Sequence, residues 1–364
     1  MKHINELSKI LNYHLNWNKA RITCLAQMLR SIIAVKTVNL SQIALGFCSK
    51  SKHESSYKRI QRFLRFFEFD LSSIVKIVFA VFPLSRKIIL IMDRTNWKWG
   101  KTHINILVLS IAYHGVSIPI FWHNLAKAGN SKTEDRIKIV SKILNFIGAN
   151  KIKYLLADRE FVGNEWFDWL MATKIKFIIR IKSDTMIRRF EKDKKCSIPV
   201  SGLFRRLKNS KHKNLNKPYW LDKYPIFLSA SRSSTGELLI LATPKFSRKA
   251  LATYKKRWEI ETLFSCLKSR GFCLEDTRLI KETRIEKLFF VLTLAFCWSY
   301  KIGIEKSKNK IIKIKKHGRK SHSLFRYGLE VLRKAVLNND QIMKFLLKIF
   351  LDPSYSKKGG YVCL

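Results

Sequence analysis

Hydrophobic positions in about the first 80 residues recur at helical spacing, as Leu25 and Leu29 illustrate. The spacing predicts an all-helical N-terminal region. Asn39 and Ser41 are candidate caps for a short helix over residues 42–47, because their side-chain oxygens can accept hydrogen bonds from the first free backbone N–H groups.

A second helix is predicted over residues 55–67, after a loop of Ser, Lys and His. It carries Lys58, Arg59 and Arg62 among apolar residues. A short helix followed by a basic one suits a helix-turn-helix unit that binds DNA. The alternative is a small helical bundle whose surface is basic without binding anything.

The pattern changes to strands after Lys87. Ile88–Met92 is predicted as a short apolar strand that ends at Asp93, and two further strands are joined by a turn at His114-Gly115. These two strands are His103–Tyr113 and Val116–Trp122.

Helices then alternate with strands. Ser131 is the predicted N-cap of the next helix, with Glu134 in the capping-box position. The predicted elements are a helix over Ser131–Phe146, a strand over Tyr154–Ala157 that runs into Asp158, a helix over Glu165–Thr173 and a strand over Lys176–Lys182. The order β-β-β-α-β-α-β matches an RNase H-like core, so we expect an α/β fold with a mixed sheet.

Residues 184–244 are rich in predicted strands and contain the basic loop Arg205–Lys217. The strands are Tyr219–Leu221, Pro225–Ala230 and Glu237–Ala242. We interpret this segment as a β-rich insertion in the core, and the chain after Arg270 as helical. The predicted division is a helical DNA-binding domain (1–84), the first part of the core (85–183), the insertion (184–246), the last part of the core (247–300) and a basic helical C-terminal region (301–364).

Four polar side chains mark the helix predicted after the insertion. Tyr254, Arg257, Glu261 and Lys268 fall within an arc of about 60° on a helix of 100° per residue. Glu259 points away from this stripe. A salt-bridged, solvated helix face accounts for the stripe as well as a phosphate-handling site does.

The charge of the chain indicates its partner. Lys and Arg number 71 against 26 Asp and Glu in 364 residues, a formal net charge of +45. A polyanion is the expected partner, because each neutralised phosphate releases counterions and strengthens binding. We expect nucleic acid rather than a membrane, since no long basic helix has a clean apolar face.

Other sequence features limit the class of protein. The strongly apolar run Leu288–Trp298 is shorter than the roughly 20 residues that span a bilayer. The first residues lack the apolar core of a signal peptide, so a cytoplasmic location is expected. The seven cysteines form no CxxC pair, which argues against a zinc site or a disulfide framework.

Three carboxylates could form one site. Asp93 and Asp158 each follow an apolar strand, and the first and fourth strands of such a core are neighbours. A helix packed beside them could add Glu261. Hard oxygen ligands of this kind suit two Mg²⁺ or Mn²⁺ ions that activate a nucleophile at phosphorus. Each acid also has an ordinary alternative, as a turn residue or as the partner of an adjacent arginine.

Three motifs resemble a known family. The segments Asp93–Trp97 (DRTNW), Ala157–Phe161 (ADREF) and Tyr254–Lys268 are similar to motifs of the DDE transposases of bacterial insertion sequences with the YREK signature, Y-x2-R-x3-E-x6-K. All four signature positions match, and both aspartate motifs precede them in the right order. The resemblance covers roughly residues 87–271.

The resemblance implies cut-and-paste transposition: binding of terminal inverted repeats, nicking, hairpin formation and opening, and strand transfer into target DNA. It implies that Asp93, Asp158 and Glu261 hold the two ions, and that Tyr254, Arg257 and Lys268 contact phosphates. It also implies a homodimer on paired ends, in a bacterial cytoplasm and associated with the nucleoid.

Several alternatives stay open at this stage. A nuclease or resolvase would use the same metal ligands, and an inactive remnant could bind DNA as a repressor. Glu160 could replace Asp158 if the strand extended that far. Trp220 and Trp258 could stack on an unpaired base, although aromatic residues in apolar surroundings more often belong to the core.

Overall fold

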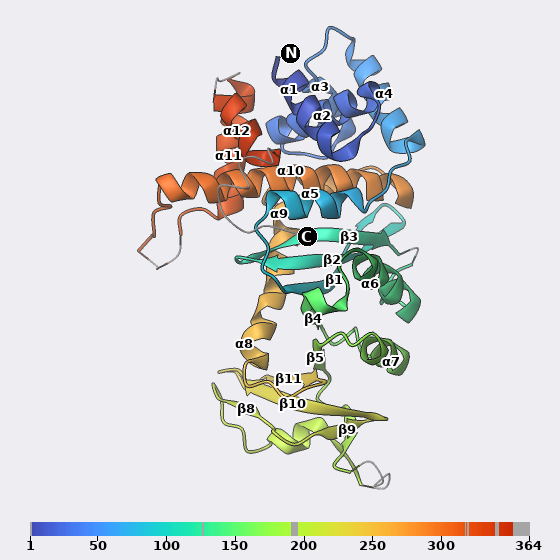
Figure 1. The fold of residues 1–364 in the computed structure, drawn as a ribbon, viewed down its shortest axis with the longest axis vertical. Helices are drawn as coiled ribbons and strands as arrows, with labels where there is room; N and C mark the ends of the chain where they lie inside the picture. Colours follow the sequence, from blue (N-terminus) through green and yellow to red (C-terminus); the bar gives the residue numbers. More distant parts are fainter. Residues whose placement is uncertain are drawn as a thin grey trace.

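The computed structural model describes residues 2–125, 127–190, 196–316, 318, 320–338 and 342–351. Helices form one end of the molecule, a mixed sheet with flanking helices forms the middle, and a β-rich part forms the other end (Figure 1). The end of the predicted C-terminal region, residues 352–364, lies outside the described residues.

The N-terminal region is helical, as the spacing of its apolar residues predicts. Asn39 is the N-cap of the short third helix, and its side chain accepts hydrogen bonds from the backbone N–H groups of Ser41 and Gln42. The basic helix begins at His53, two residues before the predicted start. The five helices are α1 (Lys2–Leu15), α2 (Lys19–Val35), α3 (Leu40–Leu45), α4 (His53–Phe66) and α5 (Ser73–Val81).

The central elements follow the predicted order. They are β1 (Ile88–Trp99), β2 (Thr102–Tyr113), β3 (Val116–Asn124), α6 (Thr133–Ile147), β4 (Ile152–Ala157), α7 (Asn164–Ala172) and β5 (Phe177–Ile181). The strands lie in the order β3-β2-β1-β4-β5. β1, β4 and β5 are parallel, and β2 and β3 are antiparallel to their neighbours.

Two predicted boundaries are wrong. β1 does not end at Asp93 but continues to Trp99, because β2 provides an antiparallel partner as far as the pair Trp99 and Thr102. Helix α6 begins at Thr133 with Lys132 as N-cap, and Asp135 rather than Glu134 accepts the Lys132 backbone N–H. Ser131 does not cap the helix, since its hydroxyl and its carbonyl oxygen accept hydrogen bonds from Arg136.

The β-rich insertion extends the central sheet. Its strands are β6 (Met186–Arg188), β7 (Ser197–Pro199), β8 (His212–Asn214), β9 (Tyr219–Leu221), β10 (Tyr224–Arg232) and β11 (Leu238–Thr243). β11 pairs antiparallel with β5, so that Ile240 lies opposite Ile181, and β10 follows next. The insertion is therefore anchored to the strand beside β4.

The chain returns from the insertion to the sheet through a broken helix. Helix α8 (Ala250–Tyr254) passes through a 3-10 turn (Lys255–Arg257) into α9 (Trp258–Leu267). The single continuous helix expected for the four-residue stripe is wrong in this respect. Lys268 has left the helical backbone conformation, with φ −85° and ψ −123°.

Helix α10 (Glu282–Asn309) joins the helical end to the sheet (Figure 1). It is the one helix in the described ranges that is long and apolar enough to cross a membrane, and 89% of that stretch is buried inside the fold. Trp298, at the centre of α10, is fully buried, and its indole N–H donates to the carbonyl of Leu346. Helix α10 therefore has the burial of a core helix.

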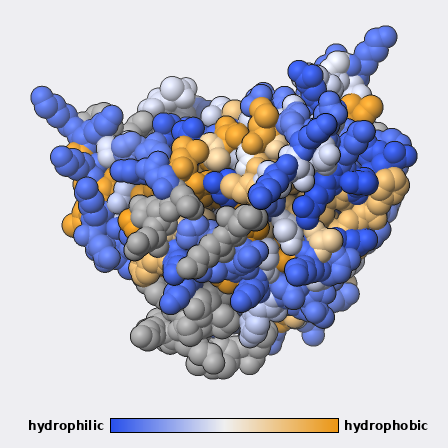
Figure 2. Space-filling model, turned by 90° about the horizontal axis from the view of Figure 1, so that it is seen from above, coloured by the Kyte–Doolittle hydropathy of each residue, from blue (hydrophilic) through white to orange (hydrophobic). Residues whose placement is uncertain are grey.

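The C-terminal helices pack beside the N-terminal ones. Arg30 on α2 donates to the carbonyl of Val336, and Arg333 donates to the carbonyl of Ala34. These contacts involve α11 (Leu324–Leu337), and α12 (Ile342–Leu351) follows it. Hydrophilic side chains cover much of the helical end (Figure 2).

Candidate active site

Asp93 lies in β1, and Asp158 directly follows the neighbouring strand β4. The last pair in the parallel register of β1 and β4 is Met92 with Ala157, and each aspartate is the next residue of its chain. Neighbouring strands are about 4.8 Å apart. The predicted adjacency of the first and fourth strands is confirmed. Asp158 follows the end of β4, as predicted, whereas Asp93 lies within β1 rather than at its end.

Arg257 connects two of the predicted acids. Its Nη1 lies 3.1 Å from Asp93 Oδ2, and its Nη2 lies 2.6 Å from Glu261 Oε1. The Arg257 side chain is only 7% exposed and Asp93 is 20% exposed, whereas the Glu261 side chain is 41% exposed to solvent. Tyr254 donates from its hydroxyl to Asp158 Oδ1 at 3.5 Å. The structure thus gathers Asp93, Asp158, Tyr254, Arg257 and Glu261 into one cluster.

Burial makes Asp93 unusual. It raises the pKa of this carboxyl from 3.8 to about 6, against hydrogen bonding from the Arg94 backbone and the charge of Arg257. The charges of Glu160 and Asp158 raise the pKa further. The ionised carboxylate therefore lowers the free energy of unfolding, and perturbed pKa values of this kind are common at functional sites.

Replacement of this carboxylate should stabilise the metal-free protein. The pKa of Asp93 is higher in the folded state than in the unfolded state. Its favourable contribution to the free energy of unfolding is therefore complete below about pH 4 and is lost as pH rises through about 6. Asp93→Asn should raise the free energy of unfolding by roughly 1–3 kcal/mol near pH 7.5 and leave it almost unchanged near pH 4. Urea unfolding in a chelator measures both values, and equal effects at the two pH values would contradict this cause.

Glu259 is held away from the cluster. Its carboxylate accepts hydrogen bonds from the backbone N–H groups of Tyr113 at 2.8 Å and Gly115 at 3.2 Å, at the turn between β2 and β3. Burial raises the pKa of Glu259. This glutamate anchors a turn, in agreement with its position off the polar stripe.

Glu160, the alternative to Asp158 as a metal ligand, forms an ion pair with Arg94. Arg94 donates to both of its carboxylate oxygens, from Nε at 2.6 Å and from Nη2 at 2.5 Å. A bidentate pair of this kind is strong and fixes the direction of the carboxylate. Asp158, which directly follows β4, stays the predicted metal ligand of this segment.

The donor chemistry of the cluster suits a hard divalent cation, because three carboxylates lie on adjoining elements. In the described part of the chain, no three His, Cys, Asp or Glu side chains are placed to hold one ion directly. The Arg257 guanidinium lies between Asp93 and Glu261 and pairs with both. The donor set therefore suits a divalent metal ion by its chemistry.

A family model for the transposase DDE domain matches residues 84–298, which is more than half of the chain and includes all five residues of the cluster. The chain belongs to the transposase DDE domain family. DNA transposition is the general function of this family, and its members generally use divalent metals.

Two other comparisons add little to the family assignment. The structure of a piggyBac transposase synaptic complex with hairpin DNA is similar at a TM-score of 0.47 and 12% identity, and the match covers 98% of this chain and 82% of that chain. No curated protein matches the sequence.

Lys268 of this DDE transposase lies at the edge of the cluster. Its Nζ donates to the carbonyl of Asn96 at 3.1 Å and pairs with Glu275 at 2.7 Å. It also lies 5.9 Å from the ring centre of Trp97. The last signature residue is thus attached to the part of β1 beyond Asp93, rather than to the acids.

The predicted DNA-binding residues of α4 differ in their placement. Lys58 and Arg62 are exposed to solvent. Arg59 instead lies against α2, where it donates to the carbonyl of Ala20 at 3.0 Å. Two of the three cations are therefore available on the transposase surface, and Arg59 connects two helices.

The two tryptophans also differ. Trp258 is 59% exposed, and the guanidinium of Arg257 lies 5.0 Å from its ring centre. Trp220 is half-buried in β9 and lies opposite Pro225. Base stacking by either ring stays a prediction, and the exposure of Trp258 beside the cluster makes it the more accessible one.

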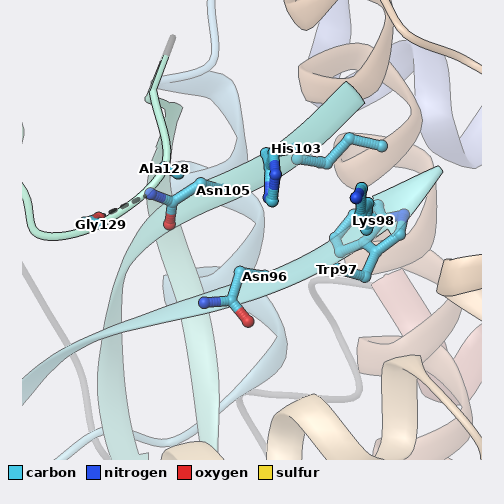
Figure 3. A pocket seen from close by; sticks show the side chains of 8 residues that line it. Asn96, Trp97, Lys98, His103, Asn105, Ala128 and Gly129 are labelled. Carbon is cyan, nitrogen blue, oxygen red and sulfur yellow. Dashed lines mark hydrogen bonds between the residues drawn. The ribbon is translucent and has the colours of Figure 1, made fainter. Parts of the chain in front are cut away.

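A pocket of about 260 Å³ lies along β1 beyond Asp93 (Figure 3). Its lining residues are Asn96, Trp97, Lys98, His103, Ile104, Asn105, Ala128 and Gly129. The side chain of Asn105 reaches across to the carbonyl of Gly129 (Figure 3). The pocket wall is therefore a loop held in place by a buried amide.

Sequence reasoning missed two arginines near the acids. Arg94 binds Glu160, and Arg180 lies 3.9 Å from Asp158 and 2.9 Å from Glu237. The position of Arg94 directly after Asp93 was a usable signal. Arg180 has no such signal, since its partner Glu237 belongs to the insertion.

Proposed function

We propose that this transposase performs cut-and-paste transposition of a bacterial insertion sequence, with the YREK signature helix packed against an RNase H-like core. The observation that carries the proposal is the register of β1 and β4, which sets Asp93 beside Asp158, together with Arg257, which ties Asp93 to Glu261. Such a cluster on a chain of charge +45 is suited to phosphodiester chemistry.

Asp93, Asp158 and Glu261 would hold two Mg²⁺ or Mn²⁺ ions. When bound, such ions would lower the pKa of an attacking oxygen and neutralise charge on the leaving oxygen. The fold supplies their ligands from three different elements: β1, the end of β4 and α9. Strand β1 holds Asp93, whereas Asp158 follows directly after the last residue of β4.

Arg257 and Tyr254 exchange partners when DNA binds. In the structure, their polar atoms are bonded to the carboxylates. A phosphate of the transposon end competes for the same guanidinium, which binds phosphate in a planar, two-pronged geometry. Movement of Arg257 onto the DNA leaves Asp93 and Glu261 free, while Lys268 adds a point charge at the other end of α9.

The reaction on DNA consists of four phosphoryl transfers. Water attacks the phosphorus at each transposon end and releases a 3′-hydroxyl. That hydroxyl attacks the opposite strand, which forms a hairpin and separates the flanking DNA. Water then opens the hairpin, and the regenerated 3′-hydroxyl attacks target DNA. The chain acts as a homodimer on paired ends, with Lys58 and Arg62 of α4 contacting the terminal inverted repeats in the bacterial cytoplasm.

A supercoiled plasmid with paired inverted repeats, incubated with the protein and Mg²⁺, tests this function. Excision with hairpin ends is the expected result. Indiscriminate nicking would instead indicate a nuclease or resolvase built on the same acids. Binding of the repeats without cleavage would indicate a DNA-binding remnant that acts as a repressor.

A further inference from the structure

Arg94 uses its whole guanidinium in hydrogen bonds. Its Nε and Nη2 donate to Glu160, its Nη1 donates to Asn105 Oδ1 and to the carbonyl of Gly129, and its Nη2 also donates to Asn130 Oδ1. These are all five N–H groups that an arginine has. The Arg94 side chain is 11% exposed.

The partners of Arg94 are themselves held in place. The Asn105 amide donates to the carbonyl of Gly129 at 2.9 Å (Figure 3). It also donates to the carbonyl of Lys127 at 2.9 Å. Arg136 on α6 donates to the backbone carbonyl of Glu160 at 3.0 Å. The network therefore joins β1, β2, the loop after β3, the start of α6 and the segment after β4.

The two segments that carry the aspartates meet in this network. Arg94 directly follows Asp93, and its backbone N–H donates to Asp93 Oδ1 at 2.8 Å. Glu160 lies two residues after Asp158, at a point where β4 has ended. Because no ladder bonds follow Ala157 in β4, the direction of the chain at Asp158 depends on contacts such as the one to Glu160.

We propose that Arg94 and Glu160 form a positioning pair that fixes Asp158 relative to Asp93, so that both carboxylates can ligate the same metal centre. The inference deepens the proposed function and rests on it. Lysine cannot replace Arg94, because an ammonium has three donors and no planar fork for the two oxygens of Glu160. Groups that orient metal ligands in this way typically account for about 10–100-fold in metal affinity.

The test is a titration of Mn²⁺ into the protein bound to a duplex that carries the terminal repeat, followed by electron paramagnetic resonance. Arg94→Gln, Arg94→Lys and Glu160→Gln should each raise the Mn²⁺ dissociation constant about 10–100-fold. The double variant with both glutamines should bind Mn²⁺ no more weakly than the worse single variant, since the two residues act as one unit.

Arg232→Gln is the matched control. Arg232 also binds loop carbonyls, those of Phe204, Leu207 and Gly236, but it lies in the insertion away from the acids. Its loss should leave the Mn²⁺ dissociation constant within about twofold, as expected for distant sites. The unfolding temperatures of all variants show which ones fold. If Arg94→Gln does not fold, Glu160→Gln tests the positioning pair in its place.

The outcomes separate the two proposals. Wild-type Mn²⁺ affinity in a folded Arg94 or Glu160 variant would overturn the positioning role and leave the proposed function intact. An equal loss in Arg232→Gln would also overturn it, since the effect would then be general. If the wild-type complex binds no Mn²⁺ at all, the proposed function itself fails.

Discussion

Glu261→Gln should abolish strand cleavage at the transposon ends while leaving binding of those ends nearly intact. The amide keeps the shape of the side chain but loses the charge that would hold a divalent ion. Loss of several kcal/mol of metal-derived stabilisation lowers the rate on the order of 10³-fold or more. Gel electrophoresis of an end-labelled duplex that the protein nicks measures the cleavage rate, and fluorescence anisotropy measures binding of the same duplex.

Glu259→Gln is the matched control for this variant. Glu259 lies two residues earlier in the same helix, yet its oxygens accept backbone N–H groups at the β2–β3 turn. A glutamine can satisfy only one of them, so a loss of roughly 1–3 kcal/mol in the free energy of unfolding is expected, with cleavage retained. Full cleavage activity in Glu261→Gln would remove Glu261 from the site.

DNA affinity should fall steeply as salt increases. A protein that makes 6–10 phosphate contacts loses about 10³–10⁵-fold in affinity between roughly 50 and 200 mM salt, because the release of the same number of counterions gains less entropy in a more concentrated salt solution. The charge of +45 leads us to expect this range. Anisotropy titrations over several salt concentrations give the slope of log affinity against log salt.

Variants of α4 refine the salt experiment. Lys58→Ala with Arg62→Ala should reduce the magnitude of the slope by about two, since each exposed cation neutralises about one phosphate. Arg59→Gln is the matched control, because Arg59 is bonded to the carbonyl of Ala20. This variant should weaken the packing of α4 on α2 and lower the free energy of unfolding, while the salt slope stays unchanged. Affinity that barely changes with salt would contradict phosphate-dominated binding.

The order of the central elements was predictable from the sequence because each has a clear period. Apolar runs with short turns marked β1 to β3, and amphipathic spacing marked α6 and α7. The polar stripe correctly separated Glu261 from Glu259, although its helix is broken by the 3-10 turn at Lys255–Arg257. Both residues still lie in α9, so their relative directions were preserved.

Long-range partners were not predictable. β1 continues past Asp93 only because β2 is long enough to pair with it, which the local pattern around Asp93 does not reveal. The bond between Arg94 and Glu160 joins positions 66 residues apart. The inward direction of Arg59 depends on the packing of α2 against α4. In each case the decisive partner lies on another element.

The most direct test of the metal site is a crystal structure of the protein bound to a terminal-repeat duplex and Mn²⁺, with anomalous scattering to locate the ions. We expect two Mn²⁺ ions held by Asp93, Asp158 and Glu261, with the Arg257 guanidinium on a DNA phosphate. Anomalous density elsewhere, with Arg257 still between Asp93 and Glu261 on bound DNA, would contradict the account.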